Sequence, residues 1–96
     1  MIYTGRIPKP KNTSQRYRAE TPDRVVSAYI RYQIALKGFT VSYVAEETGT
    51  AQGDVSNVIS GRRHSRRVEA YLAKLLGYGS WNDAIRSIRV ITADVA

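Results

Sequence analysis

Apolar side chains recur three or four positions apart through most of the chain after residue 20, the spacing of one face of an α-helix. Short polar segments, most of them with glycine, separate these apolar stripes, each of which would form one face of a helix. The predicted inward positions are Val26, Ile30 and Ile34, widened by Val25, Tyr29 and Leu36; Val41, Val44, Ala45 and Thr48; Ala51, Val55, Val58 and Ile59; Val68, Leu72, Leu75 and Leu76; and Trp81, Ile85 and Ile88. Helices this short are not stable alone in water, so they must pack on one another. The pattern therefore predicts an all-α fold, a compact bundle of about five short helices.

Polar residues before the stripes supply the expected helix starts. Thr21-Pro22-Asp23 offers a hydroxyl to cap free amides, a proline suited to a first turn and a carboxylate near the positive helix end. Thr40 and Ser65 are candidate caps, and Ser80 with Asp83 forms a candidate capping box. The expected helix ends are Gly38, Gly49, Gly61 and Gly77.

Three regions follow from this pattern. Residues 1–20 hold all but one of the prolines, show no sustained helical period and are predicted to be a flexible basic arm. Residues 21–88 contain the candidate core and form the predicted domain, and residues 89–96 form a C-terminal tail.

The net charge of +7 is unevenly distributed. Residues 1–19 contribute +5 because they contain five Lys and Arg and no acid. A second basic cluster consists of Arg62, Arg63, Arg66 and Arg67. Two basic segments suggest a polyanionic partner, because cations that meet phosphates release condensed counterions. Composition alone leaves open that both segments are merely solvated.

The sequence argues against several other classes of protein. Without cysteine and with a single histidine, the chain has neither disulfides nor a zinc site of the usual kinds, and we expect no cofactor. It shows no paired carboxylates, phosphate-cradling glycine loop or nucleophile with a base at helical spacing, so we expect no enzymatic activity. We interpret His64 as a solvent-side or phosphate-side residue rather than a general base, because no partner carboxylate is expected nearby in the sequence. No apolar run approaches a membrane span or a signal peptide, which predicts a cytoplasmic protein.

Residues 40–61, "TVSYVAEETGTAQGDVSNVISG", combine a small residue, a glycine turn and an apolar anchor at a regular spacing. Ala45 is small where two helices would cross, Gly49 tolerates the positive φ of a sharp turn, and Val55 anchors the next helix in the core. This segment resembles the helix-turn-helix of the phage repressor and Cro family, also called XRE-type or lambda-repressor-like. The resemblance extends over residues 24–78.

The resemblance implies a sequence-specific transcriptional regulator, expected to be a repressor, that binds double-stranded DNA as a homodimer with the helix at residues 51–60 in the major groove. Base-reading positions by this resemblance are Gln52, Gly53, Ser56 and Asn57. Expected phosphate contacts are Thr40, Ser42, Arg62, Arg63, Ser65, Arg66 and Arg67.

Three residues depart from the family pattern. Val41 stands where many members have glutamine, and Gly53 places no side chain at a base-facing position. Asp54 brings a negative charge near the DNA, so we expect it to brace an arginine or to interact with the helix dipole.

Two further functions remain open. One is a protein-interaction module, such as the antitoxin of a toxin and antitoxin pair, whose tails engage a protein and whose DNA binding is secondary. The other is a sequence-neutral nucleoid or RNA binder that relies on the basic arm. The apolar segment 81–95 is the expected dimer contact.

Overall fold

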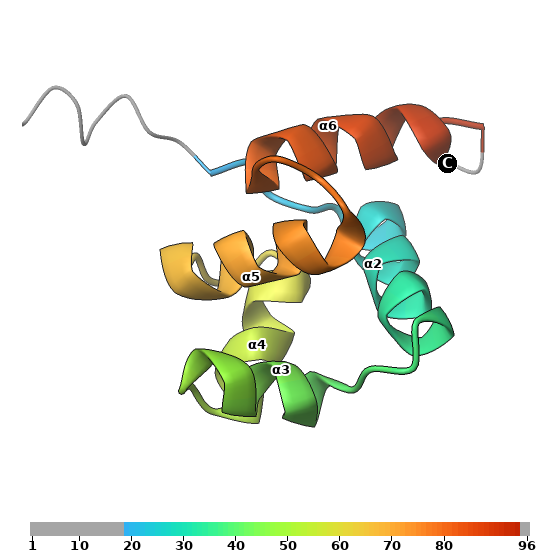
Figure 1. Ribbon diagram of the computed structural model, residues 1–96. Coiled ribbons are helices and arrows are strands. Elements are labelled where there is room, and N and C mark those ends of the chain that lie inside the picture. Colours follow the sequence, from blue (N-terminus) through green and yellow to red (C-terminus); the bar gives the residue numbers. More distant parts are fainter. Residues whose placement is uncertain (1–18, 95–96) are drawn as a thin grey trace, which may run out of the picture.

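A computed structural model describes residues 19–94, which form five α-helices and no strand within that range (Figure 1). The helices are α2 (Arg24–Leu36), α3 (Val41–Thr48), α4 (Gln52–Ile59), α5 (Arg66–Leu76) and α6 (Trp81–Ile91). The predicted all-α fold is confirmed. The predicted arm lies outside the described residues, apart from Ala19 and Glu20.

Hydroxyl caps begin three of the helices at the expected residues. The side chains of Thr40, Ser65 and Ser80 each accept a hydrogen bond from the backbone N–H three residues later, at 3.0, 3.4 and 3.1 Å. Helix α4, in contrast, begins after Ala51 without a side-chain cap and has Asp54 in its first turn. A carboxylate at that position interacts favourably with the positive end of the helix dipole.

The start of α2 differs in detail from the prediction. The cap is Asp23, whose Oδ1 accepts from the backbone N–H of Val26 at 2.9 Å. The expectation that the Thr21 hydroxyl caps this helix was wrong, because Thr21 precedes the cap and its Oγ1 lies 3.2 Å from Nε2 of His64. The N-terminal segment is thus held against the turn between α4 and α5.

Gly61 allows this close approach. Its φ is +82°, and a Cβ placed on it would lie 2.6 Å from the carbonyl oxygen of Pro22. Position 61 therefore requires glycine for two reasons: its backbone is left-handed, and a side chain would collide with Pro22.

One hydrophobic core receives side chains from all five helices. Its buried members are Val26, Ile30, Ile34, Val44, Ala45, Val55, Val58, Ile59, Val68, Leu72, Trp81, Ile85 and Ile88. Two residues expected to point inward are exposed instead. Ala51 is exposed because it is the cap residue outside α4, and Leu36, the last residue of α2, is 64% exposed.

Helix α5 lies at the centre of the bundle, since it packs against each of the other four helices. Helix α6 lies across α5 and α2, and the α3 and α4 pair lies on the opposite side of α5 (Figure 1). The outer faces of α3 and α4 are therefore left uncovered by α6.

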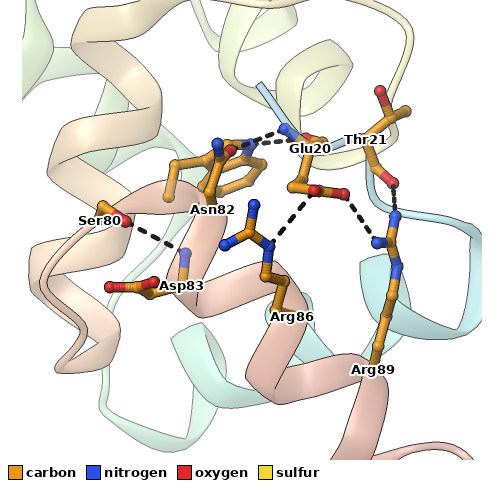
Figure 2. Close-up of polar contacts among 8 residues, drawn as sticks. Glu20, Thr21, Ser80, Asn82, Asp83, Arg86 and Arg89 are labelled. Carbon is orange, nitrogen blue, oxygen red and sulfur yellow. Dashed lines mark hydrogen bonds and ion pairs between the residues drawn. The ribbon is translucent and has the colours of Figure 1, made fainter. Parts of the chain in front are cut away.

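Residues 20 and 21 are bound along α6 (Figure 2). The backbone N–H of Glu20 donates to Oδ1 of Asn82, and its carbonyl accepts from Nε1 of Trp81, both at 2.8 Å. The Glu20 carboxylate accepts from Nη1 of Arg89 at 2.7 Å and lies 3.5 Å from Nε of Arg86. We call these contacts the Glu20 latch. The hydrogen bond from Arg89 is the main cause that lowers the pKa of the Glu20 carboxyl, against the opposing effect of burial.

The folded part is longer at both ends than residues 21–88. At the N-terminus it includes Glu20 through its latch, and Ala19 packs against the core. At the C-terminus α6 continues to Ile91, and the buried Thr92 donates a hydrogen bond to the carbonyl of Ile88 at 2.8 Å. Within the described residues, no helix is long and apolar enough to cross a bilayer.

Candidate nucleic-acid interface

The turn between α3 and α4 is sharp because Gly49 ends α3 in the left-handed conformation, with φ of +69°. The following N–H, that of Thr50, donates to the carbonyl of Ala45 at 2.9 Å, which closes the end of the helix. Ala45 of α3 is buried, and Val55 on the inner face of α4 is fully buried. These contacts fix how α4 is presented beside α3.

The outer face of α4 is polar. Because Val55, Val58 and Ile59 point into the core, helical spacing places Gly53 and Asn57 on the opposite side. Gln52 and Gly53 are exposed, whereas Ser56 and Asn57 are half-buried. The expected base-reading residues therefore share one face.

Gln52 is oriented by a contact from α3. Its Nε2 donates to Oγ of Ser42 at 3.0 Å, so the first turns of the two helices are joined at the surface. The amide keeps its second N–H and its carbonyl oxygen for other partners. This arrangement holds Gln52 beside the polar face.

Arg31 of α2 also belongs to this surface, although the sequence analysis did not include it. Its Nη2 donates to Oγ of Ser60 at 3.0 Å and to Oγ of Ser56 at 3.2 Å. The guanidinium has further N–H groups to offer. A sequence signal existed, since Arg24 and Arg31 lie seven residues apart and so share a face of α2.

Asp54 forms an ion pair with Arg63. This agrees with the expected brace between Asp54 and an arginine. Both side chains are substantially exposed, so the pair contributes little to stability. Its main effect is local, because the guanidinium offsets the one negative charge on α4.

The remaining arginines of the basic cluster separate in space. Nη1 of Arg67 donates to the carbonyl of Thr48 at the end of α3, at 3.2 Å. Arg66 lines a hollow with Trp81 at the start of α6. Arg62 is exposed in the turn after α4. Of these three side chains, Arg62 lies nearest in sequence to the polar face of α4 and lines a hollow with Ser60 of that segment.

The hydroxyls of Thr40 and Ser65 are used locally as helix caps. Each oxygen accepts a backbone N–H, which leaves the hydroxyl proton free to donate. These two hydroxyls therefore remain chemically suited to a phosphate oxygen.

The interpretation of His64 as a residue without a carboxylate partner was wrong. Its Nδ1 lies 2.8 Å from Oε2 of Glu69, a side chain only 1% exposed. Glu69 follows the core residue Val68 and shares the inner face of α5 with Leu72, which is the sequence signal for its burial. The histidine thus links α5 to Thr21.

A scan against protein-family models, a search of curated proteins and a search of solved structures each found no match. Among the described residues, no group of three or more His, Cys, Asp or Glu is placed to hold a metal ion. Function is therefore inferred from the polar face of α4 and its neighbours.

Proposed function

We propose that this protein is a sequence-specific regulator of transcription that binds double-stranded DNA, with α4 in the major groove. The observation that carries this proposal is the outer face of α4, where uncharged polar side chains stand beside arginines from other segments. A helix in the groove needs short hydrogen-bonding side chains toward the bases and cations toward the phosphates.

Base reading would fall to Gln52 and Asn57. Both amides can bond adenine through N6 and N7 at once. Gln52 is held in place by Ser42, and the side chain of Asn57 has no hydrogen bond within residues 19–94. Gly53 has no side chain on this exposed face, which would let the helix backbone approach the bases closely.

Phosphate binding would fall to groups around this face. Arg31 and Arg62 supply charge, and Thr40 offers a hydroxyl at the start of α3. The contact between Arg67 and Thr48 supports a structural role for Arg67 instead. This set of cations differs from the cluster that the sequence alone suggested.

The proposed assembly is a homodimer. One short helix covers few base pairs, so useful specificity needs two copies about 34 Å apart. The end of α6 is a suitable contact, because Val90 and Ile91 are 77% and 52% exposed. Large apolar side chains in such positions are common in protein interfaces.

Selection of bound sites from random duplex DNA tests the proposal. A two-fold symmetric consensus is the expected result. Enrichment of no sequence, with equal binding to RNA, would instead favour a sequence-neutral nucleic-acid binder. Absence of binding to any duplex would contradict the proposed function.

A further inference from the structure

A hollow of about 380 Å³ lies between the start of α2 and the end of α4. Its lining is polar for the most part and consists of Pro22, Asp23, Arg24, Ser27, Ser60 and Arg62. The preceding sections assign no role to this hollow.

Ser27 lines the hollow with an unsatisfied hydroxyl. The residue is only 9% exposed, and its side chain has no hydrogen bond within the described residues. Its backbone N–H is already used, since it donates to the carbonyl of Asp23 at 2.8 Å. A buried hydroxyl without a partner in the protein is unfavourable, so Ser27 favours a hydrogen-bonding group that enters the hollow.

The charges around the hollow favour an anion. Arg24 from α2 and Arg62 from the turn after α4 are both exposed, and neither guanidinium has a hydrogen bond or ion pair within residues 19–94. Asp23 is the opposing charge, but its Oδ1 already accepts from the N–H of Val26. Two arginines against one aspartate leave the lining net positive.

Two further features make the hollow more favourable for an anion. The start of α2 contributes the partial positive charge of a helix N-terminus. Arg31 donates to Oγ of Ser60, one of the lining residues, at 3.0 Å. The hollow therefore has hydroxyl donors, guanidinium donors and a helix start within one concave surface.

We propose that this hollow is a phosphate site. The Ser27 hydroxyl donates to one oxygen, and Arg24 and Arg62 hold the others, since guanidinium groups bind phosphate oxygens in pairs. Arg31 donates to Ser60, which lines the hollow, and to Ser56 on the polar face of α4, so the hollow lies beside that face. A phosphate of the DNA backbone beside the groove fits this position, an assignment that rests on the proposed function; a free phosphate ion has the same chemistry.

Titration of the full-length protein with sodium phosphate tests the site independently of DNA. Amide chemical shifts of Val25, Ser27 and Arg62 are followed, with sodium chloride at equal ionic strength as the reference. Saturable shifts specific to phosphate are expected. Ser27→Ala and Arg24→Gln should each raise the apparent Kd for phosphate about tenfold. Lys74→Gln, which removes one exposed charge from α5, should not.

The second arm measures affinity for duplex DNA with the same variants. Ser27→Ala should lower it about tenfold, and Arg24→Gln should also reduce the salt dependence by about one ion, whereas Lys74→Gln should have little effect. Loss in the DNA arm identifies a backbone phosphate, and loss in the titration alone identifies a free phosphate ion. If neither variant differs from Lys74→Gln in either arm, the phosphate site is refuted. Absence of DNA binding by the unaltered protein would contradict the proposed function. The titration would still show whether the hollow binds phosphate.

Thermal melting provides a control for folding. Because the Ser27 hydroxyl has no partner in the protein, Ser27→Ala should melt at or above the temperature of the unaltered protein. Lost phosphate binding in a variant that folds at least as well cannot be attributed to unfolding.

Discussion

At the scale of single residues, Gly61 joins two segments that are distant in sequence. The positive φ at this position ends the turn after α4, and the missing side chain admits the backbone of Pro22. The approach holds the N-terminal segment near His64, whose Nε2 lies 3.2 Å from Oγ1 of Thr21. A change at this one residue should therefore disturb the α4 turn and the start of α2 together.

Gly61→Ala should be more destabilising than Gly77→Ala, measured by chemical denaturation. Both glycines have a positive φ, which costs an alanine about 1–2 kcal/mol. A Cβ at Gly77 meets nothing within 4 Å, whereas one at Gly61 collides with the carbonyl of Pro22. We expect about 1–3 kcal/mol of additional loss at Gly61. Equal losses would contradict the close approach.

At the scale of the elements, α6 stabilises the bundle partly by binding the segment before α2. Trp81 is buried, and its indole N–H donates to the carbonyl of Glu20. Arg89 adds a second connection, since its Nη2 donates to the carbonyl of Thr21 at 3.0 Å. Residues 20 and 21, at the start of the described chain, are therefore bound to its last helix, α6.

Glu20→Gln should lower the free energy of unfolding by about 1 kcal/mol at pH 7, because it removes the charge that Arg89 and Arg86 bind at a partly exposed site. The pKa of Glu20 is lowered from 4.5 in the folded protein. Its charged form therefore contributes stability above pH 4.5, and this contribution is lost as the pH falls through the folded pKa.

Urea denaturation from pH 7 to pH 3 measures this difference, with Glu46→Gln as a control at an exposed carboxylate of α3. The gap between Glu20→Gln and the unaltered protein should narrow toward acid pH. A gap that stays constant with pH would exclude the ion pairs as its cause.

Local patterns predicted the helices well. Glycines and hydroxyl caps mark helix ends, and apolar spacing marks the inner faces, so both can be read from neighbouring residues. The site was harder to predict because its contacts join separate helices. Arg31 reaches α4 from α2, and the arginines at 66 and 67 separate because successive helical residues point in directions about 100° apart.

At the scale of the whole molecule, residues 19–94 contain a complete core with five packed helices. The five Lys and Arg of the predicted arm all lie before residue 19. Removal of residues 1–18 should therefore remove these charges without removing any residue of the core.

Deletion of residues 1–18 should leave cooperative thermal unfolding intact, lower DNA affinity and make its salt dependence shallower, because five positive charges are removed. A longer deletion, of residues 1–20, also removes the Glu20 latch and should lower the melting temperature. Loss of cooperative unfolding after the shorter deletion would contradict the boundary.

The central claim is that α4 reads base sequence, and one binding experiment tests it most directly. Asn57→Ala and Arg62→Ala are compared on a selected duplex and a scrambled duplex over a series of salt concentrations. Asn57→Ala keeps the backbone carbonyl that accepts from the N–H groups of Arg62 and Arg63, so the fold should be preserved. It should cost about 1–3 kcal/mol on the selected duplex and much less on the scrambled one. Arg62→Ala should weaken both similarly and reduce the salt dependence by about one ion. Equal losses for Asn57→Ala on both duplexes, or none on either, would contradict the claim.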